Sequence, residues 1–223
     1  MFDAIQPYIS SYIWLDRRLL QRVLAQANGK VLDVGCGNKR LQQYLPAQCE
    51  YIGIDFNPLA DQHLDISTER YPFADDTFDF VICNAVLEHV ADERFVLQEI
   101  YRVLKPGGKL YVSIPFLQPY HPDPEDYRRF TTVGLGHVLQ RHGFTLIEPL
   151  GIYGTMLTIE YLTFAEFGKM LKRKHNWFNP ARWLHIGALG IVYVICKIGN
   201  IVFRPLERND DYVSPGASYL CRK

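Results

Sequence analysis

Two aspartates and two glycines stand at the ends of short apolar segments, where they could bind a ligand. Asp33, Gly35 and Gly37 close the segment that begins at Lys30, and Asp55 closes the next one. Glycines after a strand let the chain bend sharply and let a ligand approach the backbone closely. An acid about 20 residues further on is placed to accept hydrogen bonds from ribose hydroxyls. Asp33 could pair with a cationic group, so these residues predict a nucleoside-like ligand.

The glycine segment is not a complete dinucleotide fingerprint, because Arg40 stands where the third glycine of Gly-x-Gly-x-x-Gly is needed. This disfavours a pyrophosphate cofactor. In the plainer alternative, the glycines only form a turn and the aspartates only cap helices. Asp65 leaves two interpretations open, since it could face an adenine ring or cap the segment at Ser67 and Thr68.

These residues need a sheet to position them, and the hydrophobic pattern predicts one. Apolar strands are expected at 30–34, 51–55, 63–66, 78–83, 109–114 and 144–148, with helices at 11–27, 91–104 and 131–142 and a helical patch through Leu41 and Leu45. Buried strands that alternate with helices indicate a mostly parallel sheet covered on both faces. Ligands bind at the carboxyl ends of such strands, which are here Asp33–Gly37, Asp55, Asp65 and Asn84–His89.

At these residues the chain resembles the class I S-adenosylmethionine-dependent methyltransferases, in particular the large ubiquinone-biosynthesis-related (type 11) group. Segments similar to the motifs of that family follow one another in the family's order at 31–37, 51–55, 72–90 and 102–110. The resemblance implies an α/β, Rossmann-like sheet of seven strands with helices on both faces. The last strand, expected at 217–221, would be antiparallel and would pair beside the sixth.

The resemblance also implies S-adenosylmethionine as the cofactor. Gly35–Gly37 would pack against its methionine part, Asp33 would lie near its amino group, and Asp55 would hold the ribose hydroxyls. The full cofactor-binding set that it implies is Asp33, Gly35, Cys36, Gly37, Asp55, Phe56, Asp65, Ile66 and Asn84, in which Asp65 and Ile66 flank the adenine and Asn84 lines the methionine pocket. Many relatives have glycine or a small residue where Lys39 stands, which leaves the reach of the first helix open.

A proline-rich loop after the fifth strand, Pro115–Thr131, is the expected acceptor-binding lid. His121 could act as a base near neutral pH, and Tyr127 could stack on a ring. The residues assigned to catalysis are His121, Asp126 and Tyr127, and those assigned to the acceptor are Arg128, Arg129 and His89. In the alternative interpretation, Asp126 pairs with an arginine, Tyr127 packs under the next helix, and His89 is a cap or packing residue.

No metal site is expected, because His121, Asp123 and Asp126 have no recognised ligand spacing. The lid and the segment Thr132–Leu135 also look like a subgroup linked to cell-surface polysaccharide synthesis. We therefore expect methyl transfer to a small-molecule, glycan or lipid-linked acceptor. A soluble metabolite or quinone precursor as the acceptor, and a cofactor-binding module without catalysis, are the alternatives.

The 24 basic and 24 acidic residues sum to zero, which argues against a nucleic-acid partner. Their distribution is uneven. Residues 1–167 hold 14 basic and 21 acidic side chains, whereas residues 168–223 hold 10 and 3. Five cysteines without a Cys-x-x-Cys pair fit a reducing cytosol. The acidic, polar start of the chain does not resemble an export signal.

An apolar, basic segment separates the last two expected strands. The predicted division is a cofactor-binding core at 1–150, a helical insertion at 151–214 and a final core strand at 215–223. The insertion contains an expected helix start at Pro180 and the apolar run Trp183–Cys196. Residues 169–206 could lie on the inner face of an anionic membrane, pack on the protein's own core or in a homodimer, or span the bilayer. We expect a cytoplasmic protein.

Overall fold

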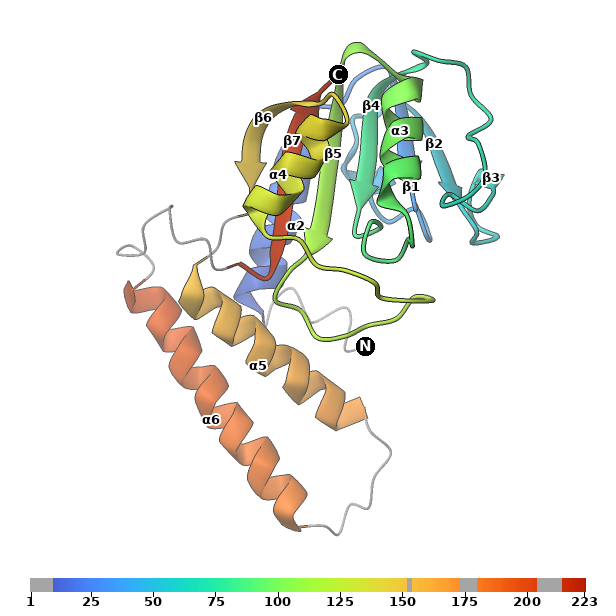
Figure 1. Ribbon diagram of the computed structural model, residues 1–223. Coiled ribbons are helices and arrows are strands. Elements are labelled where there is room, and N and C mark those ends of the chain that lie inside the picture. The colour runs from blue at the N-terminus through green and yellow to red at the C-terminus, as the bar shows by residue number, and fades with distance from the viewer. Residues whose placement is uncertain (1–9, 152–153, 173–179, 204–213) are drawn as a thin grey trace. The chain divides into compact units, whose positions relative to one another are not determined.

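The computed structural model describes residues 10–151, 154–172, 180–203 and 214–223, and these contain a sheet of seven strands (Figure 1). The strands are β1 (Lys30–Val34), β2 (Glu50–Asp55), β3 (Gln62–His63), β4 (Phe78–Asn84), β5 (Leu104–Pro115), β6 (Thr145–Leu150) and β7 (Gly216–Arg222). Their order is β3-β2-β1-β4-β5-β7-β6. Strands β1 to β5 pair in parallel, and β7 pairs antiparallel with β5 and β6. The predicted α/β class and the antiparallel last strand are confirmed.

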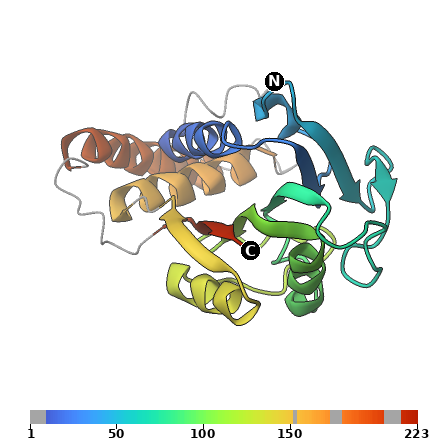
Figure 2. The ribbon, with the colours of Figure 1, turned by 90° about the horizontal axis from the view of Figure 1, so that it is seen from above.

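Helices cover both faces of this sheet, as Figure 2 shows from above. The described residues contain the helices α2 (Ser11–Leu24), α3 (Glu93–Val103), α4 (Thr132–Arg141), α5 (Thr155–Lys172) and α6 (Pro180–Phe203), of which α3, α4 and the second half of α2 cover the sheet. Helices α3 and α4 pack on one face through Leu97, Ile100 and Leu135. The second half of α2 packs on the other face through Leu20 and Leu24. Both faces of the parallel strands are therefore buried, which explains their continuous apolar sequences.

The strand order reverses at β1, because β2 lies on one side of it and β4 on the other. In an open parallel sheet, the loops that leave neighbouring strands at such a point diverge, and their backbone groups are available to a ligand. The residues that follow β1, β2 and β4 are therefore the residues to examine for a site.

Several elements are shorter than the sequence pattern predicted. The helical patch expected through Leu41 and Leu45 is a single 3-10 turn at Gln42–Tyr44, and Lys39 before it has a positive φ of 58°. The third strand has only Gln62–His63, because the Asp65 carboxylate accepts hydrogen bonds from Ser67 and Thr68 and turns the chain. Helix α3 begins at Glu93, where the Asp92 side chain caps it.

The chain divides into two compact units. The sheet unit comprises residues 18–116, 120–151 and 216–223, and the described residues 10–17, 117–119, 154–172, 180–203 and 214–215 belong to a helical unit. In the helical unit, α5 and α6 pack against each other, with the rings of Phe164 and Tyr193 6.1 Å apart. The prediction that a helix starts at Pro180 is confirmed.

Polar side chains lie between the helices of this unit. Glu160 of α5 is fully buried, and it accepts hydrogen bonds from the Asn200 side chain and from the backbone N–H of Ser11. The Lys197 ammonium lies 3.5 Å from the same carboxylate. Lys197 and Asn200 of α6 therefore face α5.

Candidate functional site

The turn after β1 is built from residues with left-handed backbone conformation. Gly35 and Gly37 have φ values of 72° and 52°, which glycine adopts without steric cost. A Cβ atom on Gly35 would lie 2.4 Å from Val86 Cγ2, so the turn after β4 packs directly on this glycine. A Cβ on Gly37 would meet no atom within 4 Å. The backbone at Gly37 is therefore open to a ligand.

Asp55 connects this turn to the end of β2. Its Oδ2 accepts a hydrogen bond of 2.7 Å from the backbone N–H of Gly37, and its Oδ1 accepts one of 2.8 Å from Asn57. The side chain is buried. A carboxylate has about four lone-pair sites, so Asp55 holds the glycine turn in place and can still accept hydrogen bonds from a ligand's hydroxyl groups.

Asp33 is a buried acid beside this turn, and its side chain is 2% exposed. Burial raises the pKa of Asp33 to about 7, although the hydrogen bond of 2.8 Å from the Tyr51 hydroxyl lowers it. The Asp55 carboxylate raises the pKa further. A carboxylate held in this way is stabilised by a cation, so Asp33 favours a positively charged ligand.

Lys39 occupies the position where the family resemblance led us to expect a glycine or a small residue. Its φ of 58° is left-handed, like that of the glycines before it. Its ammonium pairs with the Asp61 carboxylate at 2.5 Å, and the same carboxylate accepts a hydrogen bond from the backbone N–H of Gly53. The ion pair thus holds the residue in a conformation that a smaller side chain would adopt more easily.

The other residues of the predicted cofactor set lie around the same strand ends. Asn84 ends β4, and its Oδ1 accepts a hydrogen bond of 2.8 Å from the Ser113 hydroxyl. Cys36 packs under Gly53, and the Phe56 ring is 55% exposed. Asp65 caps its own turn, as described above, and the neighbouring Ile66 is buried.

The predicted acceptor residues form their own contacts in the loop after β5. The Asp126 carboxylate accepts hydrogen bonds from Nη1 and Nη2 of Arg129 and from the backbone N–H of His121. Its side chain is 1% exposed, and the Arg129 guanidinium lowers its pKa. Arg128 forms an ion pair with Glu93 at the start of α3. Asp126, Arg128 and Arg129 thus form ion pairs with other residues of the protein. The pairing of Asp126 with an arginine is what the alternative interpretation of the loop predicted.

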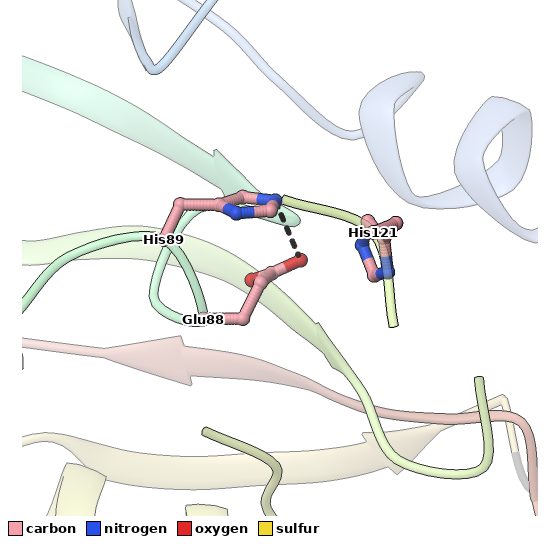
Figure 3. Close-up of side chains that lie close together, drawn as sticks. All are labelled: Glu88, His89 and His121. Atoms are coloured by element: carbon pink, nitrogen blue, oxygen red, sulfur yellow. Dashed lines mark ion pairs between the residues drawn. The ribbon is translucent and has the colours of Figure 1, made fainter. Parts of the chain in front are cut away.

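The loop brings His121 to His89 and Glu88, which follow β4 (Figure 3). The two imidazole rings are 5.3 Å apart, and His89 Nε2 lies 3.7 Å from the Glu88 carboxylate. Glu88 is fully buried, and burial raises its pKa. The Tyr127 backbone N–H donates a hydrogen bond of 2.7 Å to the Glu88 carbonyl, while the Tyr127 side chain is exposed.

Two residues of this site were assigned no role from the sequence. Glu88 lies within the segment Asn84–His89 that the sequence pointed to, and an acid next to a histidine at a strand end is a detectable signal. Tyr51 contacts Asp33 across neighbouring strands, because Asp33 pairs with Gly53 and Tyr51 lies two residues earlier. Side chains two residues apart share a face of the sheet, so the register was needed to find this pair.

The chain is similar to known methyltransferases. Residues 32–112 match the model of the family described as methyltransferase domain. An arsenite methyltransferase of Aquipseudomonas alcaligenes is 34% identical over 57% of this chain and 49% of its own length. A ubiquinone/menaquinone biosynthesis C-methyltransferase of Geotalea daltonii is 31% identical over 50% of this chain and 60% of its own length. The chain spans about half the length of curated relatives that it matches.

A solved structure of a SAM dependent methyltransferase from Archaeoglobus fulgidus has the same fold. Its TM-score is 0.58 at 16% sequence identity, and the alignment covers 100% of this chain and 99% of that chain. At this identity the likeness concerns the fold alone.

S-adenosylmethionine, the cofactor of this family, fits the residues at the strand ends. The open backbone at Gly37, the buried Asp33 carboxylate and the remaining lone pairs of Asp55 suit a cationic ligand that carries a ribose. Residues 32–112 match a methyltransferase domain, enzymes of ubiquinone biosynthesis are among the relatives of this chain, and its sheet has the fold of a solved S-adenosylmethionine-dependent methyltransferase.

Proposed function

We propose that this protein transfers a methyl group from S-adenosylmethionine to a small-molecule or lipid-linked acceptor. The observation that carries the proposal is the pair of buried acids, Asp33 and Asp55, on either side of the Gly35–Gly37 turn. One acid matches the cofactor's ammonium group, and the other matches its ribose hydroxyls.

The cofactor supplies a methyl group on a positively charged sulfur, and transfer is an in-line displacement. The task of the protein is to align the acceptor and to exclude water. The segment Tyr120–Phe130 suits this task, because the Tyr127 backbone and the His89 ring tie it to the turn after β4. Tyr127 offers an exposed ring to the acceptor, and His121 can accept its proton.

The acceptor class is inferred from the loop after β5 and the start of α4. The names of the two relatives refer to arsenite and to ubiquinone or menaquinone biosynthesis, so chemically different acceptors occur among relatives of this chain. We propose that the acceptor is a lipid-carried precursor of cell-surface polysaccharide, because the lid and the segment Thr132–Leu135 look like a subgroup linked to the synthesis of such polysaccharides. A soluble metabolite or quinone precursor is the second candidate.

Methyl transfer itself can be tested without knowing the acceptor. The full-length protein is incubated with methyl-labelled cofactor and a cell extract, which is then separated into soluble and lipid fractions. We expect label in a lipid-fraction product with the wild-type protein and not with Asp33→Asn. Label in a soluble metabolite would favour the second candidate. Cofactor binding without label in either fraction would identify the protein as a binding module. Absence of cofactor binding would contradict the whole proposal.

Helix α6 supports a place for the protein at a membrane surface. Leu184, Ile191, Ile195 and Ile198 lie on one face of the helix and are 77%, 65%, 60% and 56% exposed. The stretch Trp183–Asn200 is long and apolar enough to cross a membrane by length and composition, with a mean hydropathy of 1.4. Lys197 and Asn200 of this stretch contact the Glu160 carboxylate of α5. The face turned away from α5 is thus apolar.

The charge of the surrounding sequence favours an anionic lipid surface as the partner of this face. No acidic residue occurs between Glu166 and Glu207, whereas this stretch contains seven basic residues. Of these, Arg173, Lys174 and Arg204 lie outside the described residues. Each lysine or arginine near an anionic membrane contributes about 1 kcal/mol of attraction. We therefore propose contact with the inner face of the cytoplasmic membrane.

Flotation with liposomes tests this contact. We expect the wild-type protein to float with liposomes that contain anionic lipid, and less with neutral ones. The double substitution Ile191→Glu and Ile195→Glu should keep the protein in solution, because it places two charges on the apolar face. Val133→Glu is the matched control, since Val133 is exposed on α4. A wild-type protein that stays in solution as a dimer, and becomes monomeric with the double substitution, would identify the face as a dimer interface instead.

A further inference from the structure

The cluster of Glu88, His89 and His121 has the composition of a metal-binding site. Each residue offers one ligand atom, and these atoms all lie within 4.8 Å of one another (Figure 3). Two imidazoles and one carboxylate suit divalent transition metals, and three protein ligands leave a coordination position open for a substrate. Sequence spacing did not reveal this set, because His121 comes from a loop 32 residues after His89.

Glu88 provides an independent indication of a ligand. Its side chain is completely buried, and neither carboxylate oxygen has a hydrogen-bond partner among the described residues. Buried carboxylates are normally hydrogen-bonded or paired, since leaving them unpaired costs several kcal/mol. Figure 3 shows the carboxylate directed toward the His89 ring. Its ion-pair partner among the described residues is the His89 imidazole, whose Nε2 lies 3.7 Å away.

The surroundings of the two histidines resemble the outer shell of a metal site. His89 Nδ1 lies 2.6 Å from the backbone carbonyl of Glu125, which orients the ring and leaves Nε2 directed at Glu88. The Asp126 carboxylate lies 3.7 Å from His121 Nδ1, and Arg129 holds that carboxylate in place. Histidines that bind metals usually have a carbonyl or carboxylate at the second ring nitrogen.

The present spacing is slightly wider than in a loaded site. Zinc bonds of about 2.0–2.1 Å place two tetrahedral ligand atoms roughly 3.3 Å apart. The pair His89 and Glu88 is close to this separation at 3.7 Å, and the widest pair must close by about 1.5 Å from the 4.8 Å limit. His121 is on a loop and its side chain is 40% exposed, so rotation of this ring can supply the movement.

We propose that Glu88, His89 and His121 bind one divalent transition-metal ion, such as Zn²⁺, beside the cofactor-binding turn. Val86 contacts Gly35 and lies two residues before Glu88, which places the cluster next to that turn. The role of the ion rests on the proposed function and replaces the role of His121 as the base, since its ring then binds the metal. A hydroxyl or thiol of the acceptor takes the open position and releases its proton to solvent, and its oxygen or sulfur then accepts the methyl group as the cofactor's sulfur becomes a neutral thioether.

Metal titration of the untagged, chelator-treated full chain tests the proposal. We expect calorimetry to show one Zn²⁺ per chain, and Co²⁺ to produce visible absorption bands that Zn²⁺ removes. His121→Ala and Glu88→Gln should each weaken binding at least about 10-fold, the lower end of the effect known for outer-shell changes. His137→Ala is the matched control, because His137 is exposed on α4 of the same unit, and its affinity should equal that of the wild type.

Two results would overturn the proposal: no saturable binding by the wild type, or equal affinity in the wild type and His121→Ala. The exposed position of His121 keeps this comparison valid even when Glu88→Gln fails to fold. S-adenosylmethionine affinity is measured on the same samples. If the protein binds the cofactor but no metal, only the metal site is contradicted. If it binds the metal but not the cofactor, the proposed function is contradicted and the metal site is still supported.

Discussion

Gly35→Ala is expected to abolish measurable S-adenosylmethionine binding and to lower the free energy of unfolding by about 2–5 kcal/mol. A left-handed alanine costs about 1–2 kcal/mol, and the φ of Gly35 is 72°. The new methyl group would also lie 2.4 Å from Val86 Cγ2. Overpacking of this kind costs about 1–3 kcal/mol, because the χ1 angle of a buried, β-branched valine is restricted and the side chain has little room to move away.

A second glycine separates strain from the clash. Gly107 has a φ of 79°, and a Cβ there would meet no atom within 4 Å. Gly107→Ala should therefore lose only about 1–2 kcal/mol and should bind the cofactor as the wild type does. Urea unfolding and calorimetric titration measure the two effects. Equal losses of stability in the two variants would show that Val86 does not restrict the Gly35 turn.

Cofactor affinity is expected to fall below neutral pH, because the charge of Asp33 is lost there. The pKa of Asp33 is about 7 in the protein without ligand. The ionised acid pairs with the cofactor's ammonium, so bound cofactor lowers this pKa and binding expels the proton. Below pH 7, the dissociation constant should therefore rise by up to about tenfold per pH unit, until the pKa of the bound state is reached. Above about pH 8, the cofactor's own amino group loses its charge.

Two variants assign this dependence to Asp33. Asp33→Asn should weaken binding about 10–100-fold at pH 7.5, the equivalent of one charge-assisted hydrogen bond, and should remove the decline between pH 7 and pH 5. Tyr51→Phe should shift the decline to higher pH, because the Tyr51 hydroxyl stabilises ionised Asp33 through a bond of 2.8 Å. A wild-type affinity that stays constant from pH 8 to pH 5 would contradict an ionic role for Asp33.

Much of the fold and the cofactor end of the site could be predicted because their signals are local. Apolar strands next to helical periods indicate a parallel sheet, and such a sheet collects Asp33, Asp55 and Asn84 at one edge. Boundaries were less accurate where side chains compete with the backbone pattern. The Asp65 carboxylate ended the third strand early, and left-handed Lys39 replaced an expected helix with a single turn.

The sequence by itself determined the class of sheet, the edge that binds the cofactor and the uneven distribution of charge. Only the tertiary structure brought His121 to Glu88 and His89, and paired Asp126 with Arg129. It also turned Lys197 and Asn200 of α6 toward Glu160 and left Leu184, Ile191, Ile195 and Ile198 exposed. The physical reason is the sequence distance over which each kind of information acts. Periodicity records which residues tend to be buried along one element, whereas the partners of a side chain depend on how distant loops and helices pack.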